Sequence, residues 1–406
     1  MNSLPQHFML FFLVALVSGP VFGWLVFENH LLTHNMIGKK YNGYGFTTCV
    51  LSFICSGLVL QTKLLAILSK LSFKSQIYVG ISIFSIGLTL TYVGAVYIPE
   101  LLFVAEILLS FSGCQIHITC LQLSHNFKIH SFLMTSAFAI STTLFQFVDL
   151  NVSFYVVFVI WFILTLIVAL VFNPNFKKVQ IFAFQELQTI IKNKQHPIYL
   201  SIIFGTGFKS YYGSGYFVRL KDLGINSRNM QFVCTGANFM GIFSFLFEYF
   251  RPEWGFVISN IICVIAQVIV LVYQDIYVIA LNSVLVNVAI PSILSQAAKL
   301  SNQDSPGVNV VISAAQLLGS LFGLVIGYFL PIKFCDYIVV ISASIMQILC
   351  IIIFTVTERH NMFTNHKYQR ISDNQETQYY SEKLISENDA LYTENEYLTT
   401  ESVDQM

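Results

Sequence analysis

The stretch Phe176–Lys194, FKKVQIFAFQELQTIIKNK, divides the sequence into two halves that share one pattern. It carries lysines at both ends, and between them apolar and polar residues alternate enough to predict a short helix lying on a membrane surface. On each side of it the sequence contains six apolar runs, each about as long as a membrane-spanning helix. The sequence therefore predicts two six-helix halves joined by an amphipathic linker.

The predicted fold is all-α and polytopic, with 12 transmembrane helices. The predicted spans cover residues 7–27, 46–67, 77–97, 101–121, 131–148, 153–173, 198–217, 230–249, 255–274, 276–296, 308–330 and 334–356. Spans 9 and 10 are separated only by Gln274 and Asp275, which predicts a tight helical hairpin. The organisation follows as an N-terminal half at 1–173, a cytoplasmic linker at 174–197, a C-terminal half at 198–357 and a tail at 358–406.

The composition excludes a soluble protein for most of the chain. Of its 406 residues, 55% are hydrophobic and 10% are charged, whereas soluble domains carry about 25% charged residues. Too few charges remain to cover the apolar surface of a soluble enzyme, a nucleic-acid-binding protein or a disordered scaffold. The spans also lack paired carboxylates, a histidine-rich stripe and a Ser/His/Asp set, and no phosphate-binding loop occurs. We therefore expect no enzyme activity, cofactor, metal or nucleic-acid partner.

Basic residues in the loops predict the orientation of the chain. With the N-terminus in the cytoplasm, 14 of the 21 basic residues lie in inner segments and 6 in outer loops. This excess agrees with the positive-inside rule. Both termini are therefore expected in the cytoplasm, with the protein in the plasma membrane or an endomembrane.

The tail after residue 357 is polar and acidic. It contains ten acidic residues and is too poor in apolar residues to build a core, so we expect it to be disordered. Tyr368–Ile371 fits a tyrosine-based sorting signal that an adaptor protein would read, although a pattern of four residues also arises by chance.

The arrangement of two six-helix halves around a cytoplasmic linker resembles the major facilitator superfamily over residues 7–356. The superfamily motif after span 2 is G-x-x-x-D-R-x-G-R-R/K, and the stretch at 65–74 keeps only the basic residues Lys70 and Lys74. Ser69 stands where the motif has its acid, so the usual charged latch is not expected. A competing fold is the transporter class with unwound helices, because Gly19–Pro20 would break span 1.

Within that superfamily, the first span is the most informative. Its Gly19–Trp24 segment, GPVFGW, is similar to the first helix of the large-neutral-amino-acid facilitators and their protozoan amino-acid relatives. Tyr211–Gly213 in span 7 is similar to their Tyr-x-Gly region. The resemblance implies alternating-access transport of an amino acid through a cavity lined by spans 1, 4, 7 and 10.

Two charges lie well inside the predicted spans, Glu106 in span 4 and Lys209 in span 7. Each needs a partner or a water-filled cavity, because a charge at the bilayer centre costs roughly 2.5–3.5 kcal/mol on insertion scales. Helical spacing places Ser110, Gly113 and His117 on the face of Glu106. Gln115 falls on the opposite face, so we expect it to bond a neighbouring helix.

These residues are the first candidates for transport roles. Glu106 and His117 are candidates for binding a coupled proton, and Glu106 is also a candidate for contacting substrate. His117 alternatively satisfies a nearby backbone group. Lys209, in a glycine-rich and tyrosine-rich segment, is a candidate clamp for a substrate carboxylate; the alternatives are an ion pair with Glu106 or snorkelling to the interface.

Four further residues are candidates for contacting the substrate: Trp24, Tyr212, Ser283 and Asn287. Trp24 forms either a cavity wall or an interfacial anchor, and Asn287 either binds substrate or bonds another helix. In span 11, the glycines at 319, 323 and 327 predict close helix packing within the bundle.

The sequence thus favours a facilitative or secondary-active transporter of a small organic solute, most readily an amino acid, with or without coupling to a proton or another cation. One alternative is another solute class, such as a monocarboxylate or a sugar. The other alternative is a sensor or scaffold of the same fold that does not transport. The degenerate loop motif and the acidic tail favour this alternative.

Overall fold

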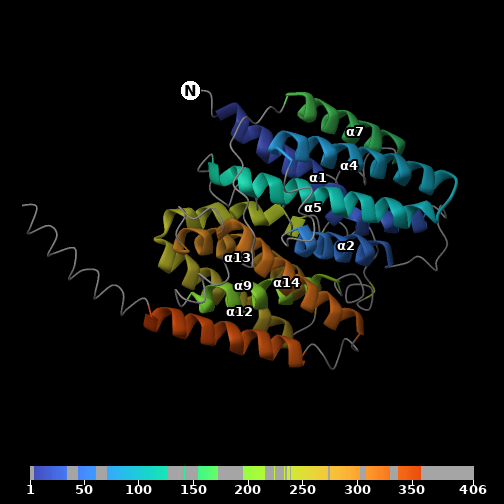
Figure 1. The fold of residues 1–406 in the computed structure, drawn as a ribbon. Helices are drawn as coiled ribbons and strands as arrows, with labels where there is room; N and C mark the ends of the chain where they lie inside the picture. Colours follow the sequence, from blue (N-terminus) through green and yellow to red (C-terminus); the bar gives the residue numbers. More distant parts are fainter. Residues whose placement is uncertain are drawn as a thin grey trace, which may run out of the picture. The chain divides into compact units, whose positions relative to one another are not determined.

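A computed structural model describes residues 4–33, 44–60, 71–126, 137, 141, 154–171, 195–214, 224, 233, 236–237, 239–272, 275–301, 308–329 and 337–357. All regular secondary structure in these ranges is helical (Figure 1). The helices are α1 (Leu4–Thr33), α2 (Tyr44–Leu60), α4 (Phe73–Val96), α5 (Leu101–Asn126), α7 (Phe154–Val171), α9 (His196–Ser214), the 3₁₀ helix η3 (Met240–Tyr249), α12 (Pro252–Val272), α13 (Ile276–Leu300), α14 (Val308–Phe329) and an unlabelled helix at Tyr337–Thr357.

Each of these helices coincides with a span predicted from the sequence. Within the described ranges, six helices are long and apolar enough to cross a membrane. They lie at Phe73–Val96, Leu101–Cys120, Pro252–Val272, Ile276–Leu300, Val310–Gly327 and Tyr337–Thr357. The chain is therefore a multi-pass membrane protein. Most of span 5, the linker up to residue 194, the tail and the sorting motif at Tyr368–Ile371 lie outside the described residues.

The N-terminal helices form one packed group in which α5 contacts α1, α2 and α4, and α7 contacts α1 and α4 (Figure 1). Polar side chains connect α4 and α5. The Gln115 side-chain amide donates to the Gln76 carbonyl oxygen at 3.1 Å, and the Thr119 hydroxyl donates to Gln76 Oε1 at 3.2 Å. The prediction that Gln115 bonds a neighbouring helix is confirmed. Such bonds matter in a membrane because lipid offers no substitute partner.

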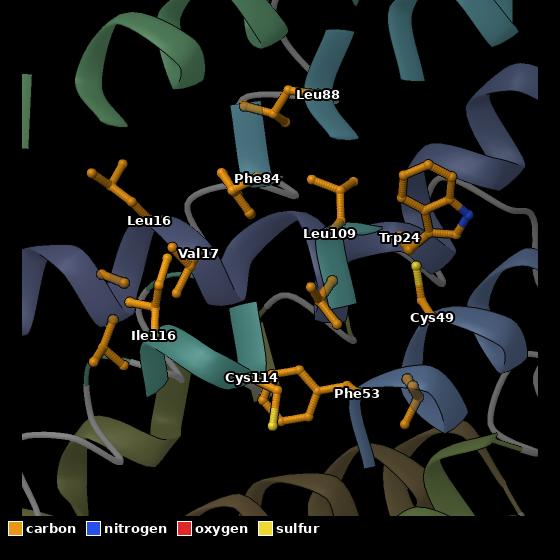
Figure 2. Packing of buried hydrophobic residues seen from close by; sticks show 14 of the residues in the cluster. Leu16, Val17, Trp24, Cys49, Phe53, Phe84, Leu88, Leu109, Cys114 and Ile116 are labelled. Atoms are coloured by element: carbon orange, nitrogen blue, oxygen red, sulfur yellow. The ribbon is translucent and has the colours of Figure 1, made fainter. Parts of the chain in front are cut away.

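Apolar side chains fill the space between these helices (Figure 2). Leu16 and Val17 of α1 lie with Phe84 of α4 and Ile116 of α5 in one buried cluster. Where α1 meets α5, a Cβ atom on Gly113 would lie 3.2 Å from the Val17 carbonyl oxygen. A glycine at this place lets the two backbones approach closely.

The C-terminal helices pack in pairs, α9 with α14 and α12 with α13. The predicted hairpin is confirmed, since α12 ends at Val272 and α13 begins at Ile276. The Asp275 carboxylate caps α13 by accepting a hydrogen bond from the Val278 N–H at 2.8 Å. This bond satisfies one of the free N–H groups at the helix start.

A chain of hydrogen bonds holds α9, α12 and the Tyr337–Thr357 helix together. Ser201 donates to Asn260 Oδ1. Gln347 donates to the same oxygen, at 3.4 Å, and accepts from the Gln267 amide at 2.6 Å. Ser344 completes the chain by donating to Gln267 Oε1 at 2.9 Å. All five side chains are buried. Their hydrogen bonds to one another satisfy polar groups for which lipid would offer no partner.

The eighth predicted span differs from expectation in its winding. Residues Met240–Tyr249 form a 3₁₀ helix instead of an α-helix. Pro252 follows closely and disfavours helical geometry at Arg251, which would otherwise donate to Phe247. The Phe247 carbonyl oxygen instead accepts from the Phe250 N–H, at 3.2 Å, and from the Gln296 side-chain amide of α13, at 2.9 Å. Tertiary contacts thus replace the α-helical bond at this end.

Candidate functional site

The first helix is longer than its hydrophobicity predicts. The predicted span ended at residue 27, which placed Glu28 in a loop, but α1 continues to Thr33. Glu28 consequently lies inside the helix and is 3% exposed. The prediction that Glu106 and Lys209 are the only charges well inside the helices is therefore wrong. Tertiary packing buries Glu28 within this extension, which a hydrophobicity window cannot detect.

Glu106 lies about a turn and a half from the start of α5 and is also 3% exposed. Its carboxylate is within hydrogen-bonding reach of Trp24 and within electrostatic range of Glu28, both on α1. On the α2 side, the Cys49 thiol lies 4.0 Å from the backbone oxygen of Glu106. Glu106 Oε2 has no hydrogen-bond partner among the described residues. The site thus combines two buried carboxylates with one oxygen that remains available.

Trp24 is the aromatic residue that closes this site. Its side chain is 1% exposed, so it lies inside the helical bundle and not at the surface position that an interfacial anchor would occupy. Phe27 packs against it edge to face, with ring centroids 4.9 Å apart. Trp24 thus lies against Glu106, and Phe27 packs on the indole.

The face of α5 that helical spacing predicted is directed at α1 and α2. Ser110 is fully buried, and its hydroxyl lies within hydrogen-bonding reach of the Cys49 thiol. Gly113 meets the Val17 backbone of α1. The half-buried His117 has its ring centroid 6.2 Å from that of Phe53 on α2. Glu106, Ser110, Gly113 and His117 therefore share one buried surface, and the acidic site lies at its beginning.

The candidates on α9 lie in a different setting. Lys209 is half-buried, and its ammonium group is within electrostatic range of Cys263 on α12. Within the described part of the chain it makes no ion pair with Glu106. Tyr212 is buried and stacks on Phe208, with ring centroids 5.6 Å apart. Lys209 is thus a cation of the C-terminal half, separate from the carboxylates of the N-terminal half.

On α13, neighbouring asparagines have different partners. Asn287 bonds within its own helix, where its amide lies 2.9 Å from the Ser283 carbonyl oxygen and 3.4 Å from the Ser283 hydroxyl. Asn282 instead donates to the Ala266 carbonyl oxygen of α12. Asn282 therefore links two helices, whereas Asn287 and Ser283 form a local polar pair.

The structure brings together Trp24 and Glu106 from the residues chosen in the sequence, and it adds Glu28, Cys49 and Ser110 to them. Glu28 was missed because it follows the apolar run. Its spacing from Trp24 could have indicated its position, since residues four apart lie on one face of a helix.

Comparison with protein-family models and with curated protein sequences finds no match. Solved structures do match. One is the crystal structure of a Major Facilitator Superfamily transporter, FucP, in the outward conformation, with a TM-score of 0.60 and 13% identity over 89% of this chain and 99% of FucP. Another is the human organic anion transporter MFSD10 (TETRAN), with a TM-score of 0.62 and 12% identity over 87% of this chain and all of MFSD10 (100%). The chain has the fold of these transporters.

Proposed function

We propose that this protein transports a small organic solute across a membrane by alternating access, with an amino acid as the favoured substrate class. The observation that carries the proposal is the fold, which this chain shares with FucP and MFSD10 over most of its length. In such folds two halves rock about a site near the middle of the membrane. Organic anions, the class named for MFSD10, and other small solutes are the competing substrates.

Buried and half-buried polar groups on the expected cavity helices support this function. Glu106 on α5, Lys209 on α9 and the pair Ser283 and Asn287 on α13 lie in helices whose other residues are mostly apolar. Polar groups at membrane depth are costly, and in transporters they mark substrate and ion pathways. Together with Trp24 and Tyr212, they make up the substrate-contact set of the proposal.

Within the proposal, the basic and the acidic side chains have complementary roles. Lys209 is the cation for a substrate carboxylate, and its neighbours Tyr211 and Tyr212 supply aromatic walls. Glu106 and His117 are the groups that would exchange a coupled proton, if transport is coupled. In this proposal both termini face the cytoplasm, so Glu28 and Glu106 lie nearer the outer side.

Uptake by the purified full-length chain in proteoliposomes tests the proposal. A panel of radiolabelled amino acids, monocarboxylates, sugars and organic anions is offered to the wild type, Lys209→Ala and Glu106→Gln. We expect saturable uptake of an amino acid by the wild type and reduced uptake by both variants. Unaltered uptake in both variants would remove the site assignment, and no uptake of any solute would contradict transport itself.

Orientation and coupling are tested in the same vesicles. An imposed pH gradient should accelerate uptake if a proton is coupled, and the acceleration should be lost in Glu106→Gln. His117→Gln serves as the second variant, because only one of the two groups is needed for a single coupled proton. Uptake that does not respond to any ion gradient would assign the protein to facilitative transport.

A further inference from the structure

The 3₁₀ helix η3 is unusual in its length. It runs over ten residues, Met240–Tyr249, whereas 3₁₀ stretches of more than three or four residues are uncommon. Residues 236, 237 and 239, just before it in the same predicted span, are α-helical. A 3₁₀ stretch within a longer helix often marks a hinge, so η3 is a candidate for a segment that changes shape.

The burial of side chains along η3 follows its winding. Residues spaced by three share an environment: the buried ones are Gly241, Ser244 and Phe247, and the exposed ones are Phe243, Leu246 and Tyr249. This period is that of a 3₁₀ helix, whereas an α-helix has about 3.6 residues per turn. In an α-helix, Phe247 would be turned by about 60° relative to Ser244. The two windings therefore direct different residues towards the bundle.

The 3₁₀ winding leaves the hydroxyl of Ser244 without a bond that hydroxyls on α-helices of this chain make. Those of Thr91 and Ser259, for example, donate to the carbonyl oxygen four residues earlier, at 2.8 and 2.7 Å. Ser244 is 1% exposed, but its hydroxyl has no hydrogen-bond partner among the described residues. An unpaired buried hydroxyl is costly, and an α-helical turn would bring the Met240 carbonyl oxygen within its reach. The 3₁₀ form thus lacks a bond that an α-helical form would supply.

A side chain of a neighbouring helix holds the 3₁₀ form at its end. The Gln296 amide of α13 donates to the Phe247 carbonyl oxygen at 2.9 Å, and the Phe250 N–H donates to the same oxygen at 3.2 Å. The second of these bonds spans three residues, as in a 3₁₀ helix. Gln296 is fully buried, and its Oε1 atom has no hydrogen-bond partner within the described ranges. Its contact with η3 therefore depends on the amide donor.

Gly255 of α12 provides the space in which this amide lies. A Cβ atom on Gly255 would be 2.9 Å from Gln296 Cδ and 3.1 Å from Gln296 Nε2. The atoms in its way form the end of a flexible side chain, so a larger residue at 255 would displace the amide before it displaced a backbone. The bond from Gln296 to Phe247 thus requires a glycine on the third helix at this place.

We propose that η3 is a two-state segment that rewinds from the 3₁₀ form to an α-helix, and that Gln296 is the latch that holds the 3₁₀ form. The rise per residue is about 2.0 Å in a 3₁₀ helix and about 1.5 Å in an α-helix, so rewinding shortens the segment by about 5 Å. Only residues 250 and 251 separate η3 from α12, which the buried bonds of Asn260 and Gln267 hold in place. The part of the span before Met240 therefore moves. The displacement is comparable with the one-turn shifts by which packed helices switch between states.

Spin labels along η3 measure its winding in the purified full-length protein without requiring transport. The eight native cysteines are replaced, and single cysteines are introduced in turn at residues 240–249 and labelled. Collisions with molecular oxygen, which dissolves in the detergent micelle, report whether each label faces the bundle or the outside. Oxygen accessibility should repeat every 3.0 residues or so, about the period of a 3₁₀ helix, while Gln296 is intact. A matched scan of residues 257–266 in α12 should repeat about every 3.6 residues in every variant.

Two substitutions should release the latch by different routes. Gln296→Met keeps the size of the side chain and removes the donor, whereas Gly255→Ala displaces the amide and leaves Gln296 in the sequence. Each should change the period of oxygen accessibility in η3 from about 3.0 to about 3.6 residues. Ser292→Ala is the matched control, because it removes a buried 2.6 Å bond to Ser259 one turn earlier on α13. This control should keep the 3₁₀ period.

Three outcomes of the scans would overturn the proposal. A 3₁₀ period in both latch variants would mean that the winding does not depend on Gln296. An α-helical period with Gln296 intact would mean that there is no 3₁₀ form to release. Loss of any period in η3, with the α12 scan unchanged, would mean that the segment unfolds instead of rewinding.

A further variant tests the proposal if neither latch variant folds. Ser244→Ala removes a hydroxyl that is buried and unpaired in the 3₁₀ form but would be bonded in the α-helical form. It should therefore favour the 3₁₀ form and raise the melting temperature above that of the wild type. An equal or lower melting temperature would contradict the two-state assignment.

Discussion

Gly323 of α14 faces Gly207 of α9 so closely that a Cβ atom on Gly323 would collide with the Gly207 carbonyl oxygen. One turn earlier, a Cβ atom on Gly319 would meet the Ile203 carbonyl oxygen and the Thr206 hydroxyl. Thr206 also bonds the Gln316 carbonyl oxygen across the same contact, at 3.3 Å. The glycine ridge predicted from the sequence therefore packs α14 against α9, the helix that carries Lys209.

Gly323→Ala should lower the melting temperature, because the new methyl group forces the two backbones apart. Inserting one carbon into a packed interface typically costs about 1–3 kcal/mol. The matched control is Gly213→Ala on α9, where a Cβ atom would have no neighbour within 4 Å. Thermal unfolding in detergent measures both variants, and equal stability of the two would contradict the close contact.

Gln267→Leu should destabilise the protein by breaking the buried hydrogen-bond chain at its centre. The change leaves the Gln347 side-chain oxygen and the Ser344 hydroxyl without Gln267 as their partner. An unsatisfied buried group costs about 1–3 kcal/mol. Ser82→Ala removes an exposed bond to the Tyr78 carbonyl oxygen and should change stability by less than about 0.5 kcal/mol. A Gln267→Leu protein as stable as this control would refute the network.

A double-mutant cycle should detect the contact between α2 and α14. A Cβ atom on Gly57 would lie 2.5 Å from Leu317 Cδ1 and 2.8 Å from the Cys114 sulfur. Gly57→Ala should therefore be destabilising, and less so when Leu317→Ala has already removed one clashing side chain. We expect the two changes to deviate from additivity by at least about 0.5 kcal/mol, the range found for residues in contact. Additive changes in unfolding free energy would mean that the residues do not touch.

Asp275→Ala should destabilise the hairpin between α12 and α13 by removing the cap at Val278. Loss of such a cap costs about 0.5–2 kcal/mol, whereas asparagine caps about as well as aspartate. Asp275→Asn should consequently remain close to the wild type in melting temperature. If the asparagine variant is as unstable as the alanine variant, the carboxylate contributes through its charge and not as a cap.

Substitutions of the two asparagines of α13 should have different effects, one on stability and the other on transport. Asn282→Ala removes a bond to α12 and should lower stability by about 0.6 kcal/mol or more, since interhelical bonds in membranes have about this value. Asn287→Ala removes a bond within one helix and should leave stability nearly unchanged, while the Michaelis constant for uptake rises. Melting curves and uptake kinetics are compared for both. An Asn287→Ala variant with unchanged uptake would exclude it from the substrate site.

Helix positions followed from the sequence because lipid removes water as a hydrogen-bonding partner, so every apolar run of sufficient length forms a helix. The bounds were less predictable. The run before Glu28 ended at residue 27, but α1 extends to Thr33, and Glu28 within this extension is buried. The 3₁₀ winding of Met240–Tyr249 was also not predicted, and the bond from Gln296 to the Phe247 carbonyl oxygen at its end comes from another helix, which spacing along the chain does not reveal.

Parts of the candidate site followed from spacing along single helices. Glu106 and Ser110 were expected on one face, and both are buried there beside Cys49. Periodicity also predicted that Gln115 faces another helix, where it bonds Gln76. Spacing does not report which helix covers a face. For that reason the sequence could offer a Glu106–Lys209 ion pair, whereas the structure pairs Glu106 with Trp24 and Glu28.

The sequence by itself determined that this protein is a helical membrane protein, because only a bilayer can accommodate 55% hydrophobic and 10% charged residues in 406. It also identified Glu106 and Lys209, whose charges are costly at membrane depth. Only the tertiary structure decided that Glu28 joins Glu106 on a buried surface with Trp24. The reason is physical: hydrophobicity and periodicity act along one helix, whereas the neighbours of a buried carboxylate depend on how α1 packs against α5.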